Sequence, residues 1–194
     1  RLADAGALTG RTLLVHGVHL DEEERELVLS SPAWIAHNPR SNMNNSVGYA
    51  SPSSLGERVL LGTDGIGADM FAESQHAFFR AREERLDADA SVVLGWLSSG
   101  ATLMSNLFET PIGRLEPGAA ADLVVLDELD GPRPTPLSGG NFPWHWMFGF
   151  TSRMVRDVMV DGRLILSERE LLTADEDSIV ELAREVAPKL WARM

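Results

Sequence analysis

The chain has 194 residues, 44% of them apolar and 24% charged, which is enough to bury a core in one large domain or two small ones. Asp and Glu outnumber Lys and Arg by 29 to 17, and the net charge of −12 argues against binding to nucleic acid or to an anionic membrane surface. The absence of cysteine excludes disulfides, thiolate metal sites and a cysteine nucleophile, and no apolar run reaches the roughly 18–20 residues of a membrane-spanning helix. We therefore expect a cytoplasmic protein that binds neither nucleic acid nor membrane.

The first third of the chain alternates short apolar runs with polar segments. The apolar runs span residues 11–17, 32–37 and 58–64. A charged helix is predicted at 21–30, and a loop rich in Ser, Asn, Gly and Pro at 38–56. Short apolar runs separated in this way are typical of parallel strands that are covered on both faces.

The middle of the chain is predicted to be helical. Amphipathic patterns predict helices at 70–86, 88–97 and 101–108, with Gly100 separating the last two. The turn-rich segment that follows, Thr-Pro-Ile-Gly-Arg-Leu-Glu-Pro-Gly, indicates a domain boundary. We accordingly expect a first domain over residues 1–113 and a second over residues 114–194.

The second domain is predicted to be rich in strands. A strand is expected at 121–127 and a loop at 131–143. Two further strands, at 155–160 and 163–166, are joined by an Asp-Gly turn and predict a hairpin. An amphipathic helix at 178–194 is expected to end the chain.

Each of the three early apolar runs ends on a polar residue: His16, His37 and Asp64. The carboxyl ends of parallel strands meet at one edge, where α/β barrels and open α/β sheets place their working residues. Three strands cannot close a barrel, and an open sheet of three parallel strands leaves unpaired edges. Because the chain also begins at Arg1 in sequence typical of a domain interior, we expect it to be the C-terminal part of a longer protein.

These polar residues have defined chemical uses. Asp64 lies in a Gly-Thr-Asp-Gly segment and is suited to bind a metal or to accept a proton from water, with capping of the next helix as its alternative role. His16 is suited to move a proton, to polarise the reacting group or to bind a metal. His37, Ser41 and Asn42 are expected near the mouth of the site, as hydrogen-bonding partners of a polar substrate.

Other polar residues are assigned structural positions. His19 is expected at the surface or at the entry to a helix, His76 at the surface or in packing, and His145 in a loop between two tryptophans. Glu73 is expected to begin its helix, with shaping of the pocket as its alternative role. Arg40 is expected beside the mouth of the site, since it follows a proline that turns the chain.

Five motifs occur in a recognisable order: VHGVHL, AHNPRSNMNN, LGTDG, GRLEPGAAADLVVLD and VRDVMVDGRLIL. Together they resemble the C-terminal half of the amidohydrolase superfamily, in the guanine deaminase/chlorohydrolase-like branch that includes SsnA-type aminohydrolases. The resemblance implies an α/β fold in which the first domain forms the last strands and helices of a (β/α)8 TIM-like barrel. The second domain would contribute strands to a small composite β-sandwich, with the final helix packed outside.

The resemblance also implies a metal site and roles for the candidate residues. One divalent metal, zinc with iron as the alternative, would be held by Asp64 and by ligands outside this chain. Asp64 would accept a proton from the attacking water, and His16 would stabilise the tetrahedral centre. His37, Ser41 and Asn42 would line the substrate pocket.

The implied activity is hydrolytic deamination of a small nitrogen heterocycle such as a purine, pyrimidine or triazine. The implied partners are the missing N-terminal half of the protein and a second copy in a homodimer. Hydrolytic dehalogenation at the same site and a non-catalytic split or remnant subunit are the alternatives. A small open sheet that binds phosphate is consistent with the spacing of the predicted strands, but the chain lacks a Gly-rich phosphate loop.

Overall fold

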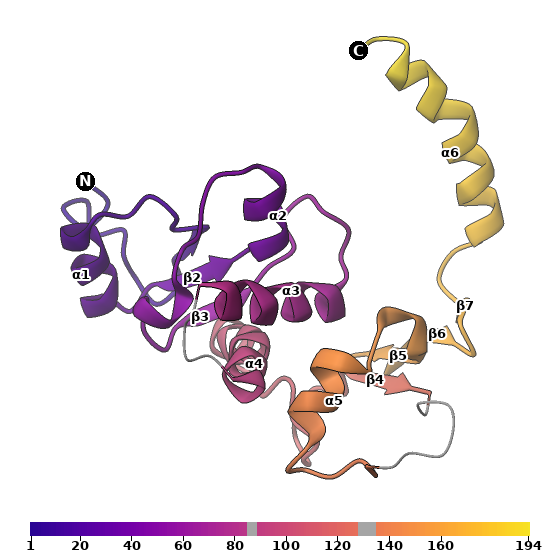
Figure 1. Ribbon diagram of the computed structural model, residues 1–194. Helices are drawn as coiled ribbons and strands as arrows, with labels where there is room; N and C mark the ends of the chain where they lie inside the picture. Colours follow the sequence, from indigo (N-terminus) through magenta and orange to yellow (C-terminus); the bar gives the residue numbers. More distant parts are fainter. Residues whose placement is uncertain (85–88, 128–134) are drawn as a thin grey trace.

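The computed structural model describes residues 1–84, 89–127 and 135–194. These residues form a parallel sheet covered by helices, followed by an antiparallel sheet and a terminal helix (Figure 1). No helix among them has both the length and the apolar composition needed to cross a membrane.

Three strands form the parallel sheet, in the spatial order β1-β2-β3: β1 (Leu13–Val15), β2 (Trp34–His37) and β3 (Val59–Leu61). Each lies within one of the three predicted apolar runs, which confirms those predictions. All residues of β2 and β3 are buried, as expected of parallel strands covered on both faces. The outer strand β1 is more exposed than the other outer strand, β3, which packs against α4.

The helices around this sheet begin at side-chain caps. The helix α1 (Glu22–Ser30) starts at a capping box, in which Asp21 accepts from the Glu24 backbone N–H and Glu24 accepts from that of Asp21. The helix α3 (Met70–Glu83) starts at Asp69, whose side chain accepts from Ala72 N–H. Both helices agree with the predicted ranges, except that the expected end of α3 lies outside the described residues.

Two predictions in this region are wrong. The segment 38–56, expected to be a loop, contains the short helix α2 (Pro39–Asn44) and the 3-10 turn η1 (Pro52–Ser54). The first begins with proline, whose fixed φ and missing N–H suit the first helical turn. The helix α4 (Ala90–Phe108) is continuous through Gly100, because buried residues on either side of the glycine, Val93 and Leu103, hold one helix against the sheet.

The continuous helix carries a testable consequence for stability. A Cβ added at Gly100 meets no atom within 4 Å, and the backbone there is helical. We expect Gly100→Ala to raise the free energy of unfolding by about 0.5–1 kcal/mol, measured by urea denaturation, because alanine restricts the unfolded chain. The matched variant Gly113→Ala should lower the free energy of unfolding. The φ of Gly113 is +73°, and the new Cβ would lie 2.7 Å from the Ala101 Cβ. A loss of stability in Gly100→Ala would contradict the unbroken helix.

The main core lies between the parallel sheet and the helices. It joins Ile35, Val59 and Leu61 of the sheet to Phe78 of α3 and Trp96 of α4. On the other face of the sheet, a smaller cluster packs against Leu103 and Leu107 of α4; its strand residues are Trp34, Ala36 and Leu60. The strand alternation therefore presents apolar side chains on both faces of the sheet, which holds the carboxyl ends of the strands in place.

The short helix α5 (Phe142–Phe148) was not predicted, because residues 131–143 were expected to form a loop and His145 to lie in one. In the chain it lies between the first and second strands of the antiparallel sheet, yet it packs against α3. The Trp146 Nε1 donates to Ser74 Oγ at 2.7 Å, and Met147 is buried in the main core. Part of residues 114–194 therefore stabilises the first sheet.

The second sheet is antiparallel and has the order β4-β5-β6-β7. Its strands are β4 (Leu123–Leu126), β5 (Val155–Val160), β6 (Arg163–Ser167) and β7 (Glu170–Leu171), with a 3-10 turn η2 (Ser152–Met154) before β5. The predicted strand and hairpin are confirmed. The predicted terminal helix is α6 (Glu176–Trp191), which buries no residue and stands away from the other elements (Figure 1).

Candidate functional site

The carboxyl ends of β1, β2 and β3 lie at one edge of the parallel sheet. Beyond the strands, His16 N–H donates to Ala36 O at 2.9 Å and Gly62 N–H donates to His37 O at 3.0 Å. These bonds continue the sheet ladders and hold the segments that follow β1 and β3 side by side with β2. The predicted edge for functional residues is therefore present in the structure.

His16 and Asp64 both have left-handed backbone conformations, with φ of +69° and +51°. Such values are costly for residues other than glycine and concentrate at functional sites. Gly17 and Gly65 follow them in the chain, and Gly17 also has a positive φ of +63°. The turn after each strand thus brings a polar side chain back over the sheet edge.

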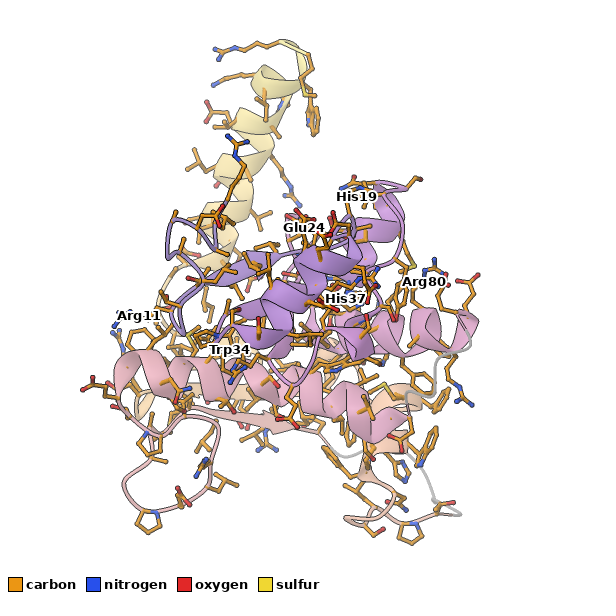
Figure 2. All side chains as sticks on the ribbon, turned by 90° about the vertical axis from the view of Figure 1, so that its left-hand side faces the viewer. Arg11, His19, Glu24, Trp34, His37 and Arg80 are labelled. Atoms are coloured by element: carbon orange, nitrogen blue, oxygen red, sulfur yellow. The ribbon has the colours of Figure 1, made fainter. Side chains whose placement is uncertain are left out.

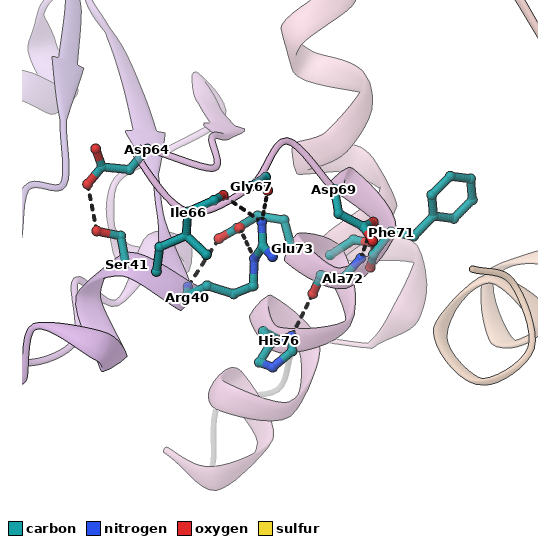
Figure 3. A network of polar contacts seen from close by, with 11 residues as sticks. Arg40, Ser41, Asp64, Ile66, Gly67, Asp69, Phe71, Ala72, Glu73 and His76 are labelled. Carbon is teal, nitrogen blue, oxygen red and sulfur yellow. Dashed lines mark hydrogen bonds and ion pairs between the residues drawn. The ribbon is translucent and has the colours of Figure 1, made fainter. Parts of the chain in front are cut away.

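Four of the predicted residues meet there. The His16 Nε2 lies 3.6 Å from Asp64 Oδ2, and Ser41 Oγ donates to the same oxygen at 2.6 Å (Figure 3). The His16 Nδ1 lies 2.8 Å from Asn42 Oδ1. Ser41 and Asn42 are both buried and come from α2, so the unpredicted helix supplies half of this group.

The hydrogen bonds favour one tautomer of His16. The Asn42 Oδ1 is an acceptor at 2.8 Å, whereas Asn38 Nδ2 lies further away, at 3.4 Å from the same Nδ1. With the amides oriented in this way, Nδ1 carries the hydrogen and the neutral ring presents Nε2 toward Asp64. In this tautomer Nε2 carries no hydrogen and faces Asp64 Oδ2 at 3.6 Å.

The surroundings of Asp64 favour its ionised form. The hydrogen bond from Ser41 lowers the pKa of the Asp64 carboxyl, and the Gly65 backbone N–H and the nearby His16 act in the same direction. The side chain is 40% exposed, so it remains within reach of a bound group. An ionised carboxylate in this position is suited to hold a cation or to accept a proton.

Asp64 fits the role of one metal ligand. Across residues 1–84, 89–127 and 135–194, no group of three His, Asp or Glu side chains is placed to hold a metal ion. Catalytic zinc sites use three protein ligands together with an open position. A metal at Asp64 therefore needs further ligands from outside the described residues.

The structure does not bring His37 to this group. Its ring is fully buried and makes edge contacts with Tyr49 and Trp96, at centroid distances of 5.6 and 6.2 Å. Successive strand residues point to opposite faces, so His37 shares a face with Ile35, which packs in the main core. Figure 2 shows His37 among the elements of this region. Burial, aided by the charge of His16, lowers the pKa of His37 to about 4.

A cavity of about 400 Å³ lies beside His16, within the range of small-molecule sites. It is lined by the segment that follows β1 and by Asn42, Asn45 and Val47. His19 is exposed, as predicted, and also lines this cavity. Asn45 was not a predicted site residue; its Nδ2 donates to Ser41 Oγ at 3.3 Å.

Two further residues were missed as supports of the site. Glu73 was expected to begin its helix, with shaping of the pocket as the alternative, but it is fully buried and paired with Arg40. Asn38 is buried, and a Cβ on Gly62 would lie only 2.4 Å from its Oδ1, so the glycine leaves room for this amide. The one available signal was the Asn-Pro-Arg-Ser-Asn run after β2, because it contains both Asn38 and Arg40.

Comparisons with known proteins identify relatives of this chain. A model described as the amidohydrolase family matches residues 1–165. A 5-methylthioadenosine/S-adenosylhomocysteine deaminase from Halobacterium salinarum is 35% identical over 198 residues, which cover 98% of this chain and 45% of the relative. The chain thus spans less than half the length of this curated relative.

Solved structures are similar in fold. A zinc-bound adenosine deaminase from Xanthomonas campestris superposes with a TM-score of 0.85 at 28% identity, covering 99% of this chain and 45% of that one. An atrazine chlorohydrolase from Arthrobacter aurescens, in complex with zinc, has a TM-score of 0.73 at 19% identity, covering 95% and 42%. These matches confirm the expected fold, part of an amidohydrolase barrel. The chain belongs to the amidohydrolase family.

Proposed function

We propose that this chain forms part of an enzyme that removes an amino group from a nitrogen heterocycle by hydrolysis. The observation that carries this proposal is the approach of His16 Nε2 to Asp64 Oδ2, at 3.6 Å, over the carboxyl edge of a parallel sheet in an amidohydrolase. The 35% identity to a named deaminase supports deamination. The chlorohydrolase, at 19% identity, supports the fold alone.

Residues outside this chain would complete the barrel. In the described residues, β1 and β3 each pair with β2 only, so each has one edge without a strand partner. Leu13 and Val15 of β1 are 43% and 50% exposed, although both are apolar. Strands that pair with these edges would cover such side chains, which supports an N-terminal half of the same protein as the partner.

We assign Asp64 as one ligand of a divalent metal, with zinc favoured by the zinc-bound relative and the other ligands outside the described residues. Such a metal, when bound, lowers the pKa of water and polarises the reacting group. The Ser41 hydroxyl and the Gly65 N–H hold Asp64 in its ionised form. This keeps the carboxylate ready for the cation.

The chain's own residues would handle the proton. Asp64 accepts a proton as the water oxygen bonds to the ring carbon, and it returns the proton to the departing nitrogen as the carbon–nitrogen bond breaks and ammonia leaves. His16 lies beside this carboxylate and stabilises the charge that develops on the tetrahedral centre. Asn42 holds the His16 ring through Nδ1, which keeps Nε2 directed toward the reaction.

The cavity next to His16 is proposed to hold the substrate. Its lining combines apolar Val15 and Val47 with the hydrogen-bonding side chains of His19 and Asn45. A heterocycle that carries a polar substituent suits this mixture. The named relative makes adenine nucleosides altered at the 5′ position the first substrates to examine.

The experiment measures ammonia release by the active protein that contains this chain, loaded with zinc. The panel comprises 5′-methylthioadenosine, S-adenosylhomocysteine, adenosine, guanine, an aminotriazine and a chlorotriazine. Ammonia from at least one amino compound is expected. Chloride release alone would replace the proposal with a dehalogenase, and no product from any compound would favour a non-catalytic subunit.

A substitution at His16 tests its assigned role. We expect His16→Ala to retain the metal while kcat falls by roughly 100-fold or more, because the ring supports the developing charge and does not hold the cation. Metal content and kcat are measured on the same preparation. His76→Ala serves as the control, since His76 is exposed on α3 and bonds only to its own helix, through Ala72 O. An unchanged kcat in His16→Ala would exclude this role.

A further inference from the structure

A buried ion pair lies next to the group of site residues formed by His16, Ser41, Asn42 and Asp64. The Arg40 Nε donates to Glu73 Oε2 at 2.5 Å, and the Arg40 backbone N–H donates to Glu73 Oε1 at 3.1 Å (Figure 3). The Glu73 side chain is fully buried, and that of Arg40 is 14% exposed. A single carboxylate thus holds both the side chain and the backbone of Arg40, which ties α2 to α3.

The same guanidinium also holds the loop between Asp64 and α3. Its Nη2 donates to Ile66 O at 3.1 Å and to Gly67 O at 2.7 Å. Arginine is suited to this task, because its planar fork presents several donors in fixed directions. One side chain therefore connects α2, α3 and the loop that carries Asp64.

The position of this connection in the chain is informative. Arg40 immediately precedes Ser41, and Ile66 lies two residues after Asp64. The contact at 2.6 Å between Ser41 Oγ and Asp64 Oδ2 thus joins two segments that Arg40 already holds together. Asn42, which contacts His16, belongs to the same short helix.

We propose that Arg40 and Glu73 are positioning residues that set the geometry of Ser41, Asp64 and His16. Neither residue lines the cavity beside His16, so their influence passes through α2 and the loop. A buried ion pair is weak evidence for stability as such, because the cost of desolvation offsets much of its attraction. The consequence for catalysis rests on the proposed function, whereas the geometric consequence does not.

The first test is spectroscopic and uses the protein that contains this chain, without substrate or added metal. Arg40→Lys keeps the charge opposite Glu73 but lacks the planar fork whose Nε and Nη2 reach the carboxylate and the two carbonyls in fixed directions. We expect the ring ¹⁵N signals of His16 to shift in this variant, while those of His76 stay unchanged. The matched control is Arg80→Lys, which alters an arginine of similar exposure that pairs with Glu83, and it should leave the His16 signals in place.

Two measurements guard against loss of folding. Glu73→Gln retains an oxygen for the Arg40 backbone N–H, and it should also shift the His16 signals. In the unmodified chain, the Arg40 guanidinium should show separate, slowly exchanging Nη signals, unlike the exposed Arg184. Unchanged His16 signals in a folded Arg40→Lys variant, or averaged Arg40 Nη signals in the unmodified chain, would overturn the proposal.

The second test is kinetic and uses the active protein that contains this chain. We expect Arg40→Lys to lower kcat by roughly 10–100-fold with little change in KM or metal content, because misplaced catalytic groups slow the reaction more than they weaken binding. A similar fall in kcat/KM that comes entirely from a higher KM, with kcat unchanged, would contradict the positioning role. If no substrate of the panel is converted, the proposed function fails, and the spectroscopic test still decides whether Arg40 positions the group.

Discussion

Replacing Asp64 with asparagine is expected to remove metal retention and to lower kcat by roughly 10²–10⁴-fold in the active protein. The amide keeps the size of the side chain but carries no negative charge, so it is a poor ligand for a divalent cation and cannot accept the proton from water. Metal content by mass spectrometry and ammonia release measure the two effects on one sample. Both should fall together.

Asp175 offers a matched control. Its Oδ2 accepts the Ser178 hydroxyl at 2.6 Å, as the Asp64 Oδ2 accepts that of Ser41, and this hydrogen bond likewise lowers the pKa of its carboxyl. Asp175 caps α6, far from the sheet edge. Asp175→Asn should keep full activity. Normal metal content and turnover in Asp64→Asn would contradict the assignment of Asp64 as ligand and proton acceptor.

Lowering the pH from 6.5 to 4 is expected to cost the folded chain about 3 kcal/mol through His37 alone. The pKa of His37 is about 4 in the folded state, against 6.5 for an unperturbed histidine, because the buried ring cannot be solvated as a cation. The unfolded chain therefore binds a proton in this interval and the folded chain does not. The stabilisation is fully present above pH 6.5 and is lost progressively as the pH falls toward 4.

Urea denaturation across this interval measures the effect. Four aspartates with lowered pKa, Asp64, Asp69, Asp157 and Asp175, also lose stabilising charge in acid, so the comparison must be between variants. His37→Phe should remove about 3 kcal/mol of the pH dependence, whatever its stability at neutral pH. His76→Phe, at an exposed position, should retain it. An unchanged slope in His37→Phe would show that the ring is protonated in the folded state.

Several elements could be predicted because their signals are local. The strands β1, β2 and β3 are short apolar runs between polar segments, and the helices α1 and α3 lie in a charged and an amphipathic segment. The hairpin β5–β6 follows from two apolar runs and an Asp-Gly turn. Each signal lies within a few residues of the element that it predicts.

Other elements depended on packing. The helix α4 continues through Gly100 because its buried contacts outweigh the cost of about 1 kcal/mol that a helical glycine carries. The helix α2 is made of residues that favour turns, and its place is set by Arg40 and Asn42, which bond to partners far along the chain. No local pattern reports contacts of this kind.

In the candidate site, too, some residues could be predicted from the sequence and others depended on packing. His16, Ser41, Asn42 and Asp64 were predicted and meet at the sheet edge, since parallel strands bring their carboxyl ends together. His37 was expected with them, yet its ring is fully buried against Trp96 of α4. At the end of a strand, the face to which a residue points depends on where the strand stops, which the sequence alone leaves open.

By itself, the sequence determined the family, the parallel strands and the polar residues that end them, because apolar periodicity and ordered motifs are properties of neighbouring residues. Only the tertiary structure decided that Arg40 pairs with Glu73, 33 residues away, that His37 is buried, and that α5 packs against α3. These outcomes depend on which distant side chains compete for the same buried space and hydrogen bonds, and that competition is settled only when the chain is packed.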